Sequence, residues 1–150
     1  MIVPVPRGGL LSIACLAGVL ALAGPSHAAT HTGKTSQDRR VALLTNQDEL
    51  TRLTFFKWRS RCSSGGRFTE TTRFIQPLDR SAPGLFFDRS FYRLRKGDGN
   101  YRIRVKVRVR GDRVSPRRWR GVFKPTAVVK RNGNEVATCS PGKLRWHARR

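Results

Sequence analysis

Acidic residues are scarce in this sequence of 150 residues: 9 Asp and Glu stand against 31 Lys and Arg, for a formal net charge of +22. Histidine is scarcer still, and beyond position 28 only His31 and His147 remain. Catalysis needs a nucleophile, a base and a group that orients the base. The sequence contains no G-x-S-x-G, no H-E-x-x-H and no phosphate-binding loop. These absences predict a protein that is not an enzyme and has no cofactor.

Metal ligands and thiols are equally sparse. Asp98 and Asn100 offer two oxygen atoms in a short turn, fewer than the six to eight that calcium takes, and we predict no metal site. Cys62 and Cys139 are the cysteines beyond position 28, and an even count in an exported chain favours one disulfide. Two free buried thiols, or a thiol catalyst made of Cys139 and His147, are the alternatives.

The sequence has one long apolar run, at 9–24, with Arg7 before it and Pro25-Ser26-His27-Ala28 after it. These parts are the charged region, apolar region and small-residue cleavage site of a secretory signal peptide, which we assign to residues 1–28. A retained membrane anchor is the alternative, but the run is shorter than the roughly 20 residues that span a bilayer. The mature chain is therefore expected to be secreted, extracellular or associated with the cell envelope, with no transmembrane segment. Because Arg7 is the one charged residue removed, the net charge falls by only one.

After residue 28 the apolar residues alternate, and turn-forming residues recur every ten to fifteen positions. This pattern predicts an all-β domain at 35–150, an antiparallel β-sandwich of about seven or eight strands, preceded by a flexible tail at 29–34. Asn132-Gly133 is a strong hairpin signal, and a two-residue loop there pairs Arg131 with Asn134 and Lys130 with Glu135. Strands are expected at 40–44, 53–62, 67–75, 85–94 as one broken strand or two, 101–110, 120–130, 136–139 and 143–149.

The C-terminal pattern C-x-x-G-x-x-R-W-x-A-R, from Cys139 to Arg149, resembles the ending of a set of small secreted actinobacterial proteins of unknown function. Thr35-Ser36-Gln37, Trp58 four residues before Cys62, Gly84 before Phe86, and Arg120-Gly121-Val122-Phe123 fit the same pattern. The resemblance implies an immunoglobulin-like β-sandwich that is exported with its two cysteines joined. It implies no activity.

The most prominent feature is YRIRVKVRVR, from Tyr101 to Arg110, in which every second residue is basic. On a strand these basic side chains share one face, about 6.7 Å apart. If 101–110 pairs with 117–123, three more arginines join them, and Tyr101 or an exposed Trp119 could stack a base. Such a patch attracts polyanions by releasing their counterions. The candidate site consists of Arg102, Arg104, Lys106, Arg108, Arg110, Arg117, Arg118 and Arg120.

The competing interpretation is that these cations are only the solvated face of a half-buried strand, where they also discourage aggregation. We therefore predict first a non-enzymatic module with a structural or interaction role at the cell envelope. The alternative is a polyanion-binding protein, whose partners would be extracellular nucleic acid or anionic envelope polymers. Trp58 and Trp146 are expected in the core.

Overall fold

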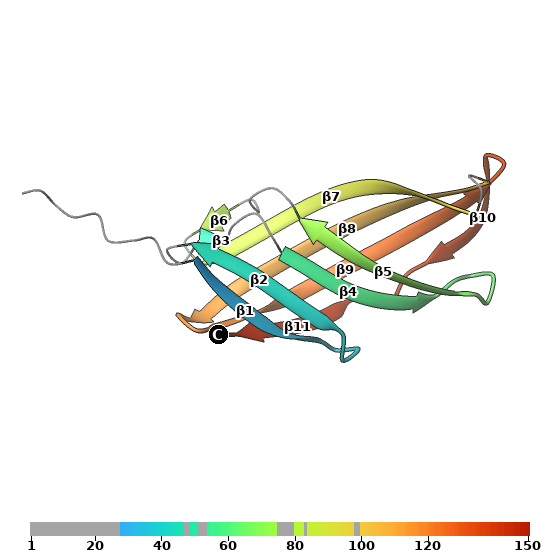
Figure 1. Cartoon of the computed structure of the whole chain (residues 1–150). Helices are drawn as coiled ribbons and strands as arrows, with labels where there is room; N and C mark the ends of the chain where they lie inside the picture. Colours follow the sequence, from blue (N-terminus) through green and yellow to red (C-terminus); the bar gives the residue numbers. More distant parts are fainter. Residues whose placement is uncertain (1–27, 47–48, 51–53, 75–79, 83, 98–99) are drawn as a thin grey trace, which may run out of the picture.

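The computed structural model of the chain describes residues 28–46, 49–50, 54–74, 80–82, 84–97 and 100–150 (Figure 1). All regular secondary structure in these ranges is β-strand, and every strand pair is antiparallel. Apart from Ala28, the expected signal peptide lies outside the described residues. The strands are β1 (Ala28–Thr35), β2 (Arg40–Asn46), β3 (Glu49–Leu50), β4 (Thr54–Arg61), β5 (Arg67–Phe74), β6 (Arg80–Ala82), β7 (Leu85–Lys96), β8 (Tyr101–Ser115), β9 (Arg118–Arg131), β10 (Asn134–Cys139) and β11 (Leu144–Arg149).

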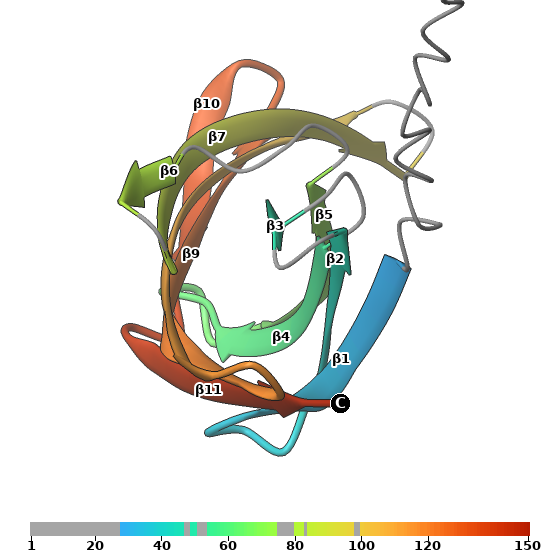
Figure 2. The same ribbon diagram turned by 90° about the vertical axis from the view of Figure 1, so that its left-hand side faces the viewer.

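The strands form one hydrogen-bonded sheet in the order β5-β4-β2-β1-β11-β9-β8-β7-β6, with β10 added to β9 and β3 to β2. The sheet curls strongly, so that its two ends face each other around the core (Figure 2). The prediction of an all-β, antiparallel fold is confirmed. The division into two sheets of an immunoglobulin-like sandwich is not confirmed, because the hydrogen-bonded path is continuous.

The prediction of a flexible tail at 29–34 is wrong, because these residues belong to β1. They pair with β2 from Ala28 to Lys34 and with β11 from Thr32 to Thr35. The segment lacks large apolar residues, so its sequence carries little strand signal. Its inward positions are instead filled by small or polar side chains, and Ala29, His31 and Thr35 are buried.

Aromatic rings from both ends of the sheet fill the core. Phe56 of β4 stacks on Phe123 of β9, with ring centroids 4.6 Å apart, and meets Trp146 of β11 edge-on at 5.4 Å. Phe86 of β7 lies 6.0 Å from Trp146. Trp58 and Trp146 are buried as predicted. Contacts of this kind between strands distant in the sequence hold the curl closed, because aromatic side chains contribute the largest buried areas.

Two glycines facing each other make room for Trp146. Gly111 of β8 is paired with Gly121 of β9, and a Cβ built on either residue would lie less than 3 Å from the indole. Glycine is therefore needed at both positions, since any side chain there would displace the ring. The strand expected at 101–110 is longer than predicted, because β8 continues through Gly111 to Ser115.

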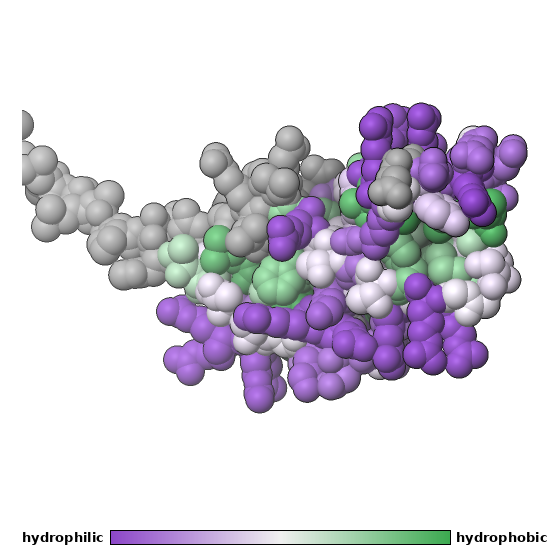
Figure 3. Space-filling model, turned by 45° about the vertical axis from the view of Figure 1, so that its right-hand side comes forward, coloured by the Kyte–Doolittle hydropathy of each residue, from purple (hydrophilic) through white to green (hydrophobic). Residues whose placement is uncertain are grey.

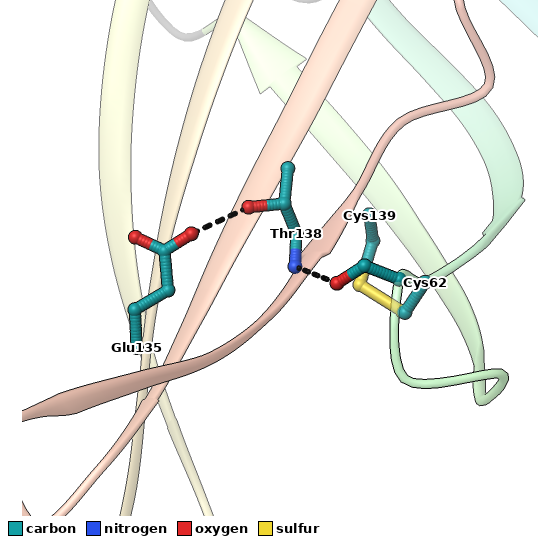
Figure 4. Close-up of a disulfide and its surroundings, with 5 residues drawn as sticks. Cys62, Glu135, Thr138 and Cys139 are labelled. Atoms are coloured by element: carbon teal, nitrogen blue, oxygen red, sulfur yellow. Dashed lines mark hydrogen bonds between the residues drawn. A yellow bond between two sulfur atoms is a disulfide. The ribbon is translucent and has the colours of Figure 1, made fainter.

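Cys62 and Cys139 form the predicted disulfide, with an S–S distance of 1.98 Å. It joins the end of β4 to the end of β10 across 77 residues (Figure 4). The Thr138 N–H, beside the bond, donates to the Ser63 hydroxyl at 3.0 Å. The hairpin that returns to Cys139 has the predicted register, with Arg131 opposite Asn134 and Lys130 opposite Glu135.

A chain of hydrogen bonds, buried at Trp58 and Thr72 and half-buried at Tyr92, connects the two ends of the sheet across the interior. The indole N–H of Trp58 on β4 donates to the Thr72 hydroxyl on β5 at 3.2 Å. The Thr72 hydroxyl lies 3.0 Å from the Tyr92 hydroxyl on β7. Burial raises the pKa of Tyr92 to about 12, opposed by the Thr72 hydrogen bond and assisted by Glu70. Since β5 and β7 are not neighbours in the sheet, this chain fixes how the curl closes.

Candidate polyanion-binding face

The five basic residues of β8 project outward, as the alternation predicted. Ile103, Val105, Val107 and Val109 are buried, and the five basic residues between and beside them are exposed. The pairing considered from the sequence, of 101–110 with 117–123, is not the one observed. β8 does pair with β9, but residues 101–110 lie opposite 122–131, and Arg118 and Arg120 lie opposite Ser115 and Asp112. The row of basic side chains on β8 therefore lies between β7 and β9, in the middle of a broad surface of the sheet rather than along its edge. It consists of Arg102, Arg104, Lys106, Arg108 and Arg110.

The strand register places cations directly opposite cations. On β7, Arg89 is opposite Arg108, Arg93 is opposite Arg104, and Arg95 is opposite Arg102. On the other side of β8, Lys124 of β9 is opposite Arg108, and Lys130 of β9 is opposite Arg102. Each of these lysines therefore extends a pair of opposed arginines to a third strand. We call twelve of the outward side chains of these three strands the basic face; Val122, Thr126 and Val128 of β9 face outward beside them. It comprises Phe87, Arg89, Phe91, Arg93, Arg95, Arg102, Arg104, Lys106, Arg108, Arg110, Lys124 and Lys130.

Few carboxylates balance the charge of this face. Arg110 Nε lies 4.0 Å from an Asp112 carboxylate oxygen. Glu135 of β10 is paired opposite Lys130 at one margin. Arg102, Arg104, Lys106 and Arg108 make no ion pair within the part of the chain that the structure describes. Like charges on directly opposed residues destabilise a sheet, so the centre of the basic face is electrostatically unfavourable in the free protein.

The arginines of the β8–β9 turn do not form one compact patch with the row. Arg120 is opposite Asp112, diagonal to Arg110, and Arg118 is opposite Ser115, farther along the strands. Both extend the outer surface toward β11, where Arg149 is opposite Arg118 and His147 is opposite Arg120. Arg117 is exposed in the turn. The sequence analysis missed the β11 residues, because their place beside β9 depends on long-range pairing.

Trp119 is not an exposed aromatic, and that prediction is wrong. The residue faces inward from β9, is 4% exposed and packs 5.9 Å from Phe86. Strand alternation places it inward because Arg118 and Arg120 face out. Tyr101, the other predicted stacking residue, is half-buried, with the Arg131 guanidinium 5.6 Å from its ring centroid.

Among the described residues, the exposed aromatics are instead Phe87 and Phe91 on β7, 37% and 59% exposed. They lie opposite Arg110 and Lys106, in the same lines as the basic row. The Arg89 guanidinium is 5.1 Å from the Phe87 ring centroid, and the Arg104 guanidinium is 5.1 Å from that of Phe91. Period-two alternation along β7 could have identified both residues as outward-facing. On the face that Figure 3 shows, apolar surface lies between projecting hydrophilic side chains.

Two shallow depressions follow the basic face and share Arg104 and Lys106. One has a volume of about 400 Å³, and Phe91 and Lys124 lie in its wall. The other has a volume of about 470 Å³ and extends past Arg93 and Arg102 toward Glu135. Together they form a track along the strands whose walls are mostly cationic.

The predicted catalytic alternative is wrong, because the Cys139 thiol is consumed in the disulfide. His31 is buried in β1, and His147 is exposed on β11. Among the described residues, no three His, Cys, Asp or Glu side chains are grouped so that they could hold a metal ion. Asp98, considered for calcium, lies outside them.

Comparison of the chain with protein-family models, with curated proteins and with solved structures gave no match. The resemblance of the C-terminal pattern to small secreted actinobacterial proteins therefore stays a prediction. Within the described ranges, the structure contains no helix of the length and apolarity needed to cross a membrane.

Proposed function

We propose that the protein is a secreted, non-enzymatic module that binds a polyanion through the basic face. The observation that carries the proposal is the register of β7, β8 and β9, which sets Arg89, Arg108 and Lys124 in one line across three strands. A strand needs polar residues on its solvent side, but it does not need the same charge opposite itself. Threonine or glutamate at some of these positions would keep the surface soluble without placing like charges opposite each other.

A bound chain of phosphates or carboxylates removes this repulsion. Each cation that contacts an anionic group releases counterions from the polymer, and that release is the main source of affinity in such complexes. The net charge, which falls only by one from +22 when the signal peptide is removed, also steers polyanions toward the protein from a distance. The track along Arg102 to Arg110 extends for several repeats of a linear polymer, so the proposed ligand is a chain rather than a small anion.

Export belongs to the proposal too. The apolar segment at 9–24 has the form of a signal peptide. The Cys62–Cys139 disulfide is compatible with an oxidising compartment, since such bonds are rare in the cytosol. The location would be extracellular or the cell envelope, where nucleic acid and anionic envelope polymers are the available partners. A purely structural role remains the second candidate, and the immunoglobulin-like architecture implied by the resemblance is not needed for either.

The test is to measure the affinity for a labelled dT12 oligonucleotide and for inorganic polyphosphate at low salt. Replacing two central cations in Arg104→Ser/Arg108→Ser is expected to weaken both affinities by at least about tenfold. The matched control, Lys57→Ser/Arg59→Ser, removes the same charge from exposed positions of β4 and is expected to have a much smaller effect. Equal losses in the two variants would mean that binding follows net charge alone and that the basic face is not the site.

A further inference from the structure

We propose that the polyanion is single-stranded nucleic acid, whose bases stack on Phe91 and Phe87 while its phosphates contact the neighbouring arginines. This inference rests on the proposed function and names its ligand. Phe91 is the most exposed large apolar side chain among the described residues, and it lies within a surface of cations. An aromatic ring contributes nothing to binding a polymer that consists only of phosphate, but it stacks on any base.

The rings alternate with the cations at the spacing that such a ligand requires. Along β7, Phe87, Arg89, Phe91 and Arg93 all face outward, and successive members are about 6.7 Å apart. The two rings are therefore about 13 Å apart, with a guanidinium between them. Across the ladder, Lys106 stands opposite Phe91 and Arg110 opposite Phe87. A base on either ring thus has cations on both sides for the phosphates that flank it.

The depression beside Phe91 offers space for a base. Its volume is about 400 Å³, and its wall combines the Phe91 ring with Arg89, Arg104, Arg108 and Lys124. The Arg104 guanidinium is 5.1 Å from the Phe91 ring centroid, a cation–π contact that orients the ring against the sheet. Because this guanidinium lies over one face of the ring, a base would stack on the opposite face or on the guanidinium plane itself.

An anionic membrane is the other ligand that would use aromatic rings and cations together, and the geometry disfavours it. The rings lie in the middle of strands and are accompanied by guanidinium groups at 5.1 Å. Inserting Phe91 into hydrocarbon would bring Arg104 with it, at a large cost in desolvation. Stacking a base on the ring leaves the same arginines at the level of the phosphates and water.

The experiment compares four probes: dT12, an abasic 12-mer with the same backbone charge, inorganic polyphosphate, and phosphatidylglycerol vesicles. The parent is expected to bind dT12 about tenfold or more tightly than the abasic 12-mer, because stacking strengthens binding by about that factor per base. Phe91→Thr, which keeps a good strand former at an exposed position, should remove most of that difference and leave polyphosphate binding unchanged. Phe87→Thr should have the same effect to a smaller degree.

Phe55→Thr is the matched control. Phe55 lies on the outer side of β4 with the Arg40 guanidinium 5.5 Å from its ring centroid, away from the basic face. It should keep the preference for dT12, and thermal melting of each variant shows that the fold is retained. If Phe91→Thr binds dT12 as tightly as the parent does, or the parent binds the abasic 12-mer equally well, base stacking is excluded.

The outcomes separate the two proposals. If Phe91→Thr keeps the preference for dT12 while Arg104→Ser/Arg108→Ser still loses affinity, the protein binds polyanions without recognising bases. If Phe91→Thr weakens vesicle binding but not dT12 binding, the ligand is a lipid surface and this inference is wrong. If the arginine variant binds every probe like the parent, the proposed function fails as well.

Discussion

The outer faces of two hairpins, β4–β5 and β7–β8, differ in the number of cations, five on the first and eight on the second, and in how these are arranged. On β4, Lys57 is opposite Thr71 and Arg59 is opposite Thr69, so two of its three outward cations face a hydroxyl. Arg61 is opposite Arg67 and is the exception, at the open end of the hairpin. On β8, every outward cation from Arg102 to Arg110 is opposite an arginine or a phenylalanine of β7.

The two arrangements fit two different requirements, solvation of an exposed strand and, under the proposed function, binding of an anionic ligand. A solvated strand satisfies its need for polar groups by mixing hydroxyls with charges, as β4–β5 does. The β7–β8 face instead accepts repulsion between opposed guanidinium groups and exposes two aromatic rings among them. Basic composition alone accounts for the first arrangement. Under the proposed function, a ligand that supplies negative charge would account for the second.

The largest effect is expected at the disulfide, which ties the β4–β5 hairpin to the β9–β10 hairpin beside the basic face. The Cys62–Cys139 disulfide connects the end of β4 to β10, which borders the β9 side of the basic face, and closes a loop of 77 residues. Replacing both cysteines by serine should lower the free energy of unfolding by about 4 kcal/mol, because the unfolded chain regains the entropy of that loop. Urea unfolding of the oxidised parent and the variant measures the loss. A change below about 1 kcal/mol would mean that the hairpins are held together by their core contacts.

A medium effect is expected at the hydrogen-bonded chain that joins β5 to β7 across the interior. Tyr92→Phe removes the hydroxyl that contacts Thr72 and should cost about 1 kcal/mol at neutral pH. The pKa of Tyr92 is raised to about 12 in the folded state, above its ordinary value of 10.0. The neutral phenol is therefore favoured by folding, and its contribution is present below pH 10 and lost as pH rises toward 12.

The difference in stability between parent and Tyr92→Phe should accordingly stay constant from pH 7 to 9 and narrow between pH 10 and 12. Using the difference cancels the titration of lysines, which both proteins share. Chemical denaturation across this range is the measurement. A difference that stays constant up to pH 12 would show that Tyr92 is not shielded from water in the folded protein.

The smallest effect is expected from removing a single cation from each of the two faces and comparing the changes in stability. Arg108→Thr relieves repulsion from both Arg89 and Lys124, so it should raise the free energy of unfolding by about 0.5 kcal/mol at low salt. Arg59→Thr, whose partner is Thr69, should give no such gain. The gain should vanish near 1 M salt, where the screening length is about 3 Å. If both substitutions behave alike, the opposed cations of β7–β8 are not under strain.

The sequence was sufficient for the features that depend on local patterns. Strict alternation from Tyr101 to Arg110 predicted which residues of β8 face inward, and Asn132-Gly133 fixed the register of the β9–β10 hairpin. The even number of cysteines beyond position 28 predicted the disulfide. Trp119 could also have been placed correctly, because its two arginine neighbours leave it the inward position.

The remaining features depend on which strands meet, and local patterns do not encode that. β1 has no large apolar residue and becomes a strand only because β2 and β11 offer it partners on both sides. The opposition of arginines on β7 and β8 requires knowing the register in which these two strands pair. That the strands form one continuous curled sheet depends on β1 pairing with β11, at opposite ends of the described chain.

The most direct test of the central claim is the salt dependence of binding to dT12. For a single-stranded ligand, the plot of log affinity against log salt has a slope of about −0.7 for each phosphate neutralised. If Arg104 and Arg108 both contact phosphates, the slope of Arg104→Ser/Arg108→Ser should be shallower than that of the parent by about 1.4, and that of Lys57→Ser/Arg59→Ser should not change. Parallel slopes for the parent and the Arg104→Ser/Arg108→Ser variant would contradict the assignment of the basic face as the site where a polyanion binds.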